Sequence, residues 1–466
     1  MLKQTTHSNR IASVAVTNDI ITGRGGVALF LRYLNTIQLL PILNNAFTRL
    51  RKSSKGLPVT TLFQQIFCFL FDGTSRHLSH FDRLGKDKGY AAILETDMKD
   101  MASSHSIKRF FALFAWCHSG AFRKILNQLF VWRLRIKSPE IVELGIDTMV
   151  MDNDEAQKRH GVQPTYKNKK GFQPLQMIWN SMIVDAVFRG GKKHSNYGNT
   201  VINMIQRMVP LIRSTCGENV LIVIRMDSGF LDQKILTVLD ELRVGFIVSG
   251  KMYNSVKEYV GRQPRHDWGQ YDHERQSWAY LEFVWGCDTW DYAYRTFYTQ
   301  PIYEAGQGLL EFARPDNVIL TNLDEDSSVL ANCTKSEREH WLKPETIIAS
   351  HHGRGADELP HRGLKDFGFE QLPFKQFAAN SAFYYCMLIA FFLFETFKQD
   401  VLEDVIPVTS YATTVRRKLV DIAAKIATTG HAVILKVSQE VMDTLRFASL
   451  WHRCNHPVPI SALPHS

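Results

Sequence analysis

The segment at residues 351–365, HHGRGADELPHRGLK, carries four side chains whose types and spacing suit the binding of phosphate. They are separated by two, three and six residues, and they are His351, Arg354, Glu358 and Lys365. If the chain is helical from residue 356 onward, the last three project from one face of the helix. Neighbouring cations keep a carboxylate ionised, which makes it a poor general acid or base. The pattern therefore favours a metal-binding carboxylate beside two cations that bind phosphate.

Two more carboxylates follow short apolar runs that predict β-strands. Asp147 follows IVELGI, and Asp227 follows NVLIVIRM, the clearest buried strand in the sequence. Cleavage of a phosphodiester by two Mg²⁺ ions needs hard oxygen ligands on rigid strands, with the ions ~3.5–4 Å apart. We therefore expect Asp147, Asp227 and Glu358 to bind metal, with Asp227 on a central strand and Asp147 on its neighbour.

Both strand-end acids have alternative interpretations. Asp227 precedes a turn and can serve simply as a helix N-cap. Asp152 or Asp154 in the loop DNDE can supply the first acid in place of Asp147. We favour Asp147 because a strand end holds a side chain more rigidly than a loop does.

Several other features have both a functional and a structural interpretation. Arg354 and Lys365 can form surface ion pairs with the glutamate between them, which contribute little to stability. The basic turn RGGKKH at residues 189–194 hints at phosphate contact, but it lacks the Walker pattern, and a solvated turn is the simpler interpretation. Two aromatic residues can stack on an unpaired base or pack in a core: Trp285 and Trp290. Three alternate residues can bind metal if they lie in a strand, or can belong to a polar tail: His452, Cys454 and His456.

The elements that must position these residues change in character along the chain. The first third of the chain predicts helices at residues 27–46, 60–71, 79–85 and 106–117. Pro41 interrupts the first of these, and Ser104 or Ser106 caps the last. From residue 141 to 248, strands and helices alternate in an α/β order. Short alternating runs dense in Trp and Tyr follow at 261–343 and are typical of antiparallel sheet. The rest of the chain predicts a buried core helix at 382–394, a basic amphipathic helix at 414–428 and a last strand at 431–438.

Charge and cysteine content limit the class of protein. Residues 1–138 hold 20 Lys and Arg against 7 Asp and Glu, a net +13 in a chain whose total is +9. This asymmetry indicates a nucleic-acid partner for the first third, although a helical dimerisation or support domain can also be basic. Seven scattered cysteines without a CxxC pair favour a reducing compartment and no structural zinc site. Without a signal-like N-terminus or a spanning apolar run, we expect neither secretion nor a membrane partner.

The spacing of the phosphate-binding segment resembles the Tyr-x2-Arg-x3-Glu-x6-Lys signature of DDE transposases from bacterial insertion sequences. His351 stands where that family has Tyr. Further similarities are RMDSGF around Asp227, VILTNL at 318–323 and GFEQLPFKQFAAN at 368–380. Asp227 and Glu358 are 131 positions apart, and this separation resembles the branch whose ribonuclease H-like core contains a β-rich insertion.

This resemblance implies an α/β fold with a ribonuclease H-like catalytic core and a β-rich insertion. An α-helical DNA-binding domain would precede the core, and C-terminal helices would follow it. We expect a basic helical domain at residues 1–138 and the first part of the core at 139–260. The β-rich insertion would follow at 261–343, the second part of the core with the glutamate helix at 344–397, and a C-terminal helical region at 398–466.

The resemblance also implies a DNA transposase that cuts insertion-sequence ends by metal-dependent phosphodiester hydrolysis and joins the 3′ hydroxyl ends to target DNA. The three acids would be catalytic ligands of two Mg²⁺ ions, with Mn²⁺ as a substitute. DNA phosphates would contact His351, Arg354 and Lys365. The implied partners are terminal inverted repeats, target DNA and a second subunit in a synaptic complex; the implied location is the bacterial cytoplasm, at the nucleoid when DNA is bound. The alternative is a catalytically inactive, transposase-derived DNA-binding protein.

Overall fold

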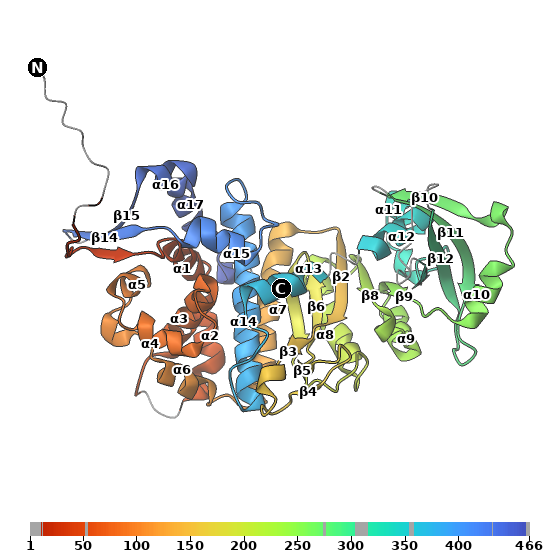
Figure 1. Ribbon diagram of the computed structural model, residues 1–466. Coiled ribbons are helices and arrows are strands. Elements are labelled where there is room, and N and C mark those ends of the chain that lie inside the picture. The colour runs from red at the N-terminus through yellow and green to blue at the C-terminus, as the bar shows by residue number, and fades with distance from the viewer. Residues whose placement is uncertain are drawn as a thin grey trace, which may run out of the picture.

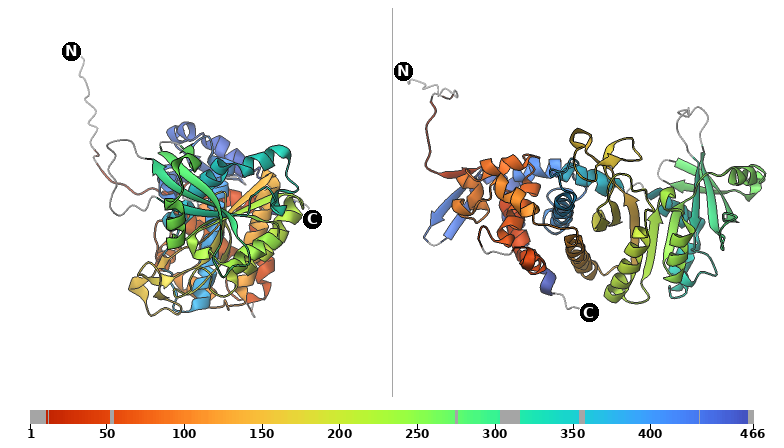
Figure 2. Two further views of the ribbon diagram at one scale, coloured as in Figure 1. Left: turned by 90° about the vertical axis from the view of Figure 1, so that its right-hand side faces the viewer. Right: turned by 90° about the horizontal axis from the view of Figure 1, so that it is seen from below.

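The protein is elongated and mixed α/β (Figure 1). The computed structural model describes residues 11, 13–51, 55–273, 276–302, 316–353, 358–430 and 432–462. N-terminal helices and the C-terminal segments lie together at one end, and a large sheet runs from the middle to the other end. Figure 2 shows the same succession from below, with the long helix α14 seen nearly end-on between the two parts.

A nine-stranded sheet forms the frame, in the order β10-β11-β12-β13-β9-β8-β2-β6-β7. The pairs β2–β8 and β8–β9 are parallel, and the other pairs are antiparallel. The central strands are almost wholly apolar, as expected where both faces of a sheet are covered. The strands are β2 (Ile141–Thr148), β6 (Leu175–Trp179), β7 (Met182–Val187), β8 (Leu221–Met226), β9 (Gly245–Ser249), β10 (Gly269–His273), β11 (Gln276–Trp285), β12 (Tyr294–Ile302) and β13 (Asn317–Thr321).

The aromatic-rich strands continue the central sheet instead of forming a sheet of their own. β13 pairs with β9, with Leu320 opposite Val248. The antiparallel prediction for this region is confirmed at β10, β11, β12 and β13. Three helices accompany these strands: α10 (Asn254–Gly261), α11 (Lys335–Leu342) and α12 (Pro344–His352).

The N-terminal third is helical apart from the short strand β1 (Ile20–Thr22). The first apolar run does form two helices, but they separate at Gln38, whose φ is 62°, and not at Pro41. Pro41 lies in the first turn of α2, where a missing N–H removes no helical hydrogen bond. The cap of α6 is Ser103, and neither Ser104 nor Ser106 as predicted; its hydroxyl accepts a hydrogen bond from the Ser106 amide. The helices are α1 (Val27–Thr36), α2 (Leu39–Phe47), α3 (Val59–Asp72), α4 (Phe81–Leu84), α5 (Lys88–Ile93), α6 (Ser104–Phe111) and α7 (His118–Lys137).

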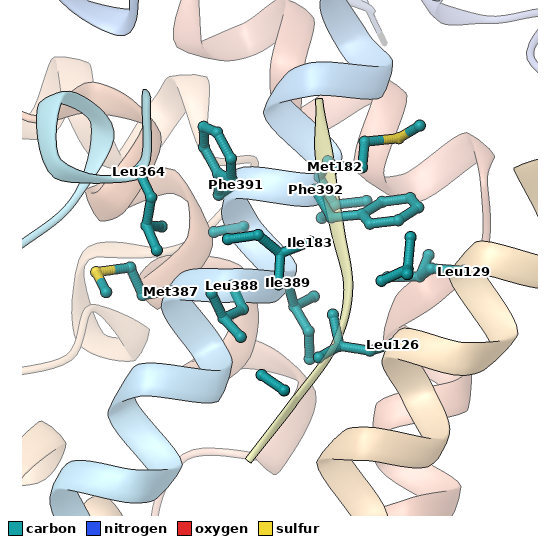
Figure 3. Close-up of a cluster of buried hydrophobic side chains, with 14 of the residues drawn as sticks. Leu126, Leu129, Met182, Ile183, Leu364, Met387, Leu388, Ile389, Phe391 and Phe392 are labelled. Carbon is teal, nitrogen blue, oxygen red and sulfur yellow. The ribbon is translucent and has the colours of Figure 1, made fainter. Parts of the chain in front are cut away.

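Helix α14 (Phe377–Phe397) is the core helix that residues 382–394 predict. Extended to Leu402, it is long and apolar enough to cross a membrane, but 89% of its most apolar window is buried inside the protein. Figure 3 shows Met387 facing Leu364 of α13 (Leu359–Phe367), while Ile389 and Phe392 face β7 and α7. Helix α14 therefore joins α13, the helix that directly follows Glu358, to the sheet. Two further helices pack beside the sheet: α8 (Thr200–Cys216) and α9 (Gln233–Glu241).

The predicted amphipathic helix at 414–428 is wrong. The chain instead forms a short helix, a π-helical turn and a strand: α15 (Ala412–Val415), Arg416–Val420 and β14 (Ala424–Thr429). Ala424 and Ile426 are buried while Lys425 is exposed, which is the two-residue period of a strand. The predicted last strand is confirmed as β15 (Ala432–Val437), while His431 lies outside the described residues.

The C-terminal region is consequently not all helical. β14 pairs antiparallel with both β15 and β1, so the two ends of the chain share a three-stranded sheet. Two helices complete the region: α16 (Gln439–Thr444) and α17 (Phe447–Cys454). Helix α17 packs on α1, which ties this region to the N-terminal helices.

Candidate active site

Asp147 and Asp227 lie at the same edge of the central sheet. β2 and β8 run parallel with Ile146 opposite Met226, so the next residue on each strand is the acid. The Asp147 carboxylate accepts a hydrogen bond from the Thr148 amide at 2.6 Å. The two acids thus stand on adjacent strands, in the arrangement expected from the sequence.

Asp227 also caps the turn that follows its strand. Its Oδ1 accepts a hydrogen bond from the Gly229 amide at 2.8 Å, and a single 3₁₀ turn, Ser228–Phe230, begins there. The predicted N-cap role of Asp227 is therefore confirmed for this one hydrogen bond. This hydrogen bond fixes the direction of the carboxylate at the strand end, so capping and ligand binding are compatible.

Glu358 stands immediately before α13, as the N-cap residue of that helix. Helix α13 begins at Leu359, and Pro360 takes a first-turn position. Residue 356, where the sequence suggests that the helix starts, lies outside the described residues. The Glu358 side chain is 54% exposed, and its Oε2 lies 3.9 Å from Arg362. Arg354 lies outside the described residues, so its predicted place beside Glu358 stays a prediction.

Tyr166 belongs to a small sheet beside the central one. Tyr166 lies in the turn between β4 (Gln163–Pro164) and β5 (Lys170–Phe172), which form a small sheet with β3 (Met151–Asp152). Partial burial and then the charges of Asp147, Asp227 and Glu358 raise the pKa of its phenol. The turn that follows β4 therefore brings Tyr166 up to the carboxylates from outside the central sheet.

His361 is a further component of the site. Its Nδ1 lies 3.7 Å from Asp147 Oδ2. Burial, reinforced by Lys365 and Lys167, lowers the pKa of His361 to about 4, so the ring is neutral at pH 7. A neutral imidazole adds a hydrogen-bonding group beside Asp147 without adding charge.

The other two residues of the signature have different surroundings. Lys365 pairs with Glu370 at 2.5 Å, and not with Glu358 as the surface-pair interpretation requires. His351 is buried, and its Nε2 is 2.9 Å from the Ser249 hydroxyl at the end of β9. Their contacts with DNA phosphate stay predictions.

The alternative first acids belong to a separate ionic cluster. Asp152 and Asp154 lie 3.3 and 3.1 Å from Lys169 Nζ. They line a cleft of about 660 Å³ that also contains Arg76 and Lys108 of the N-terminal region. Both carboxylates already have a cationic partner there, which favours Asp147 as the first acid.

The C-terminal metal hypothesis is wrong in its geometry. His452 and Cys454 lie in helix α17 and not in a strand, so alternate residues point in different directions. Cys454 is buried, while the rings of His452 and His456 stack with centroids 4.1 Å apart. Among the residues that the structure describes, no three or more His, Cys, Asp or Glu side chains form a ready-made metal cluster.

The two singled-out tryptophans pack with other aromatic residues. Trp285 stacks on Tyr253 with ring centroids 5.4 Å apart, and it lies 6.0 Å from Trp290. Both are partly buried against the hydrophobic core. Core packing accounts for these contacts, and base stacking stays untested.

Sequence reasoning missed Tyr166 and His361. His361 follows Glu358 by three residues and precedes Lys365 by four, a helical spacing that was available from the sequence. Tyr166 has no comparable local pattern, because a small separate sheet carries it to the acids.

Among known proteins, a family model matches nearly the whole chain. The model of the family described as transposase DDE domain group 1 matches residues 4–457. No curated protein matches the sequence. Seven chains of solved structures match, among them a piggyBac transposase in a synaptic complex with hairpin DNA. That match has 11% identity and a TM-score of 0.40, and it covers 86% of this chain and 80% of the other.

Proposed function

We propose that this chain, which belongs to the family of transposases with a group 1 DDE domain, cuts the ends of an insertion sequence and joins them to target DNA. The cut would be hydrolysis of a phosphodiester, and the freed 3′ hydroxyl would then attack the target strand. Asp147, Asp227 and Glu358 are the acids that we assign to this chemistry.

We further propose a ribonuclease H-like core for this reaction. Support comes from five consecutive strands of the sheet, in the order β7-β6-β2-β8-β9. The first three are joined antiparallel, and the next two continue parallel to β2. Parallel strands end at one edge, which is where ligands bind in open α/β sheets.

The observation that carries the proposal is the register of β2 on β8. Ile146 lies opposite Met226 on two parallel strands, so Asp147 and Asp227 leave the same edge of the sheet although they are 80 residues apart in the sequence. Carboxylates on adjacent strand ends repel one another, so the arrangement is unfavourable unless a cation is shared between them.

The chemistry of these three donors fits Mg²⁺, and Mn²⁺ as a substitute, because such ions prefer carboxylate oxygens. Two bound ions would supply an activated water and neutralise charge on the leaving oxygen. The protein contributes the rigid strand ends of Asp147 and Asp227, each oriented by a backbone amide. We assign Glu358, which is exposed at the start of a helix, as the third donor.

The cations around the acids would hold the DNA backbone. Lys365 lies on the same helix as His361, which borders Asp147. We assign Lys365, Arg354 and His351 to phosphate contacts, and the basic N-terminal helices to recognition of inverted repeats. A second copy of the chain would hold the second DNA end. In a bacterial cell this activity belongs to the cytoplasm, at the nucleoid.

The test is a cleavage assay on a duplex that carries the DNA flanking the gene, where inverted termini are expected. Wild-type protein with Mg²⁺ should cut at the terminus and yield a joined product with a second DNA. Asp227→Asn keeps the hydrogen bond to Gly229 but loses a charge, and it should reduce cutting at least ~100-fold while DNA binding is retained. Asp443→Asn, an exposed aspartate of α16, is the matched control and should cut normally.

The outcomes separate three kinds of protein. Cutting and joining by the wild type, lost in Asp227→Asn, supports the transposase. DNA binding without any cutting by the wild type would identify an inactive, transposase-derived binding protein. Cutting without joined product would identify a nuclease.

A further inference from the structure

The connection between β7 and α8 borders the turn that follows Asp227. This connection is the segment at residues 189–199, RGGKKHSNYGN, which we call the basic loop. A Cβ added to Gly229 would lie 2.8 Å from Ser195 Oγ and 2.9 Å from Asp227 Oδ1. Ser195 of the basic loop and the carboxylate of Asp227 therefore face the same point.

The basic loop carries positive charge that is not neutralised. Lys192 and His194 are exposed, and Lys193 Nζ lies 3.5 Å from the centre of the Tyr197 ring. In the part of the chain that the structure describes, no carboxylate lies within 4.0 Å of Lys192 or Lys193. These cations are available to an external anion.

Helix α8, which follows the basic loop, adds to the positive potential around the loop. Helix α8 has no acidic residue in its first turn, and the side chain of its N-cap residue, Asn199, makes no capping hydrogen bond. A helix N-terminus carries partial positive charge and free N–H groups, so cations beside it are unfavourable and an anion is stabilised.

Arg189 provides an independent sign that an anion belongs here. Its side chain is 5% exposed, and its pKa is lowered to about 10 by burial. It donates to the carbonyls of Gln173 and Ser195 at 3.1 and 3.2 Å, while its Nη2 has no hydrogen-bond partner. A buried guanidinium that contacts only neutral groups is costly, and a nearby negative charge offsets that cost.

We infer that the basic loop binds a backbone phosphate of the DNA strand that lies against Asp227. This inference rests on the proposed function and names a part of its substrate contact. Lys192, Lys193 and the Ser195 hydroxyl would donate to the phosphate, and Arg189 would hold the loop in shape through the Ser195 carbonyl. Contacts to phosphate position DNA without reading its sequence, so the loop serves any DNA end or target.

The experiment measures the affinity for a duplex across a series of KCl concentrations, with EDTA present so that no cutting occurs. The variant is Lys192→Ala/Lys193→Ala. Its matched control is Lys335→Ala/Lys257→Ala, two exposed lysines of α11 and α10. Each phosphate contact that is lost lowers the slope of log affinity against log salt by about 0.9. We expect a slope lower by about 1 to 2 in the loop variant and an unchanged slope in the control.

One further variant and three outcomes test whether the basic loop binds phosphate. Lys192→Arg/Lys193→Arg should restore the salt slope, because the charge returns. A loop variant that melts like the wild type and keeps the wild-type slope would overturn the inference, while wild-type cutting would leave the transposase assignment intact. Wild-type protein that neither binds nor cuts DNA would overturn both.

Discussion

Arg416 joins two helix ends and offers the sharpest test of how the site is supported. Its guanidinium donates to the carbonyls of Leu70 and Phe71 at the end of α3, at 2.8 and 3.0 Å. It also donates to Asp366 and Phe367 at the end of α13, at 3.2 and 2.6 Å. Helix α13 follows Glu358 and carries Lys365, so Arg416 fixes the glutamate helix to the N-terminal helices.

Arg416→Met keeps an unbranched apolar stem but removes every donor. The last carbonyls of a helix have no partner within the helix, and leaving a buried acceptor unsatisfied costs ~1 kcal/mol at the lower limit. Four such carbonyls predict a loss of about 4 kcal/mol in the free energy of unfolding. Arg416→Lys should lose about half as much, because a compact ammonium reaches one helix end and not both.

Urea unfolding of the wild type, the two variants and Arg417→Met would measure these differences. Arg417 is the exposed neighbour, and its replacement should change stability by less than ~0.5 kcal/mol. DNA cutting by Arg416→Met, measured below its unfolding transition, should fall because α13 is no longer fixed. A loss below ~1 kcal/mol, or equal stability of the Met and Lys variants, would refute the reasoning.

Three further predictions concern the body of the protein. Asp185 is fully buried between Arg123 and Arg207, so Asp185→Asn should cost ~3–5 kcal/mol in urea unfolding; a loss under 1 kcal/mol would contradict a buried ionic network. Burial raises the pKa of Glu395 from 4.5 to about 7, so its contribution to stability is full below pH 4.5 and is lost as the pH rises to 7. Wild type should therefore lose stability relative to Glu395→Gln over that range, and parallel pH profiles would exclude this cause. A Cβ at Gly171 would lie 1.9 Å from the Met151 carbonyl oxygen, so Gly171→Ala should lower the melting temperature, whereas Gly120→Ala, in the open first turn of α7, should leave it equal or higher.

The part of the site that sequence reasoning found was determined by local pattern. Asp147 and Asp227 each follow a strand with an almost continuous apolar run, and parallel strands bring their ends together. Pro360 is compatible with its place in the first turn of α13, because a helix needs no N–H from its first residues.

The errors arose where a residue serves a distant segment. The residues around Arg416 look like the polar face of a basic helix, yet Arg416 points inward to carbonyls about 345 and 50 positions away. Arg417 and Lys418 are exposed, so only two members of the basic run form a polar face. No periodicity in the local sequence distinguishes these three cations, and the same holds for Tyr166.

The pairing of β13 with β9 makes the aromatic-rich half of the molecule mechanically continuous with the strand that ends at Asp227. A domain on a flexible tether can swing without disturbing its neighbour, but an outer strand of a shared sheet can move only by twisting or shearing the ladder beside it. A force applied at the far edge, β10, is therefore transmitted through β13 and β9 to β8.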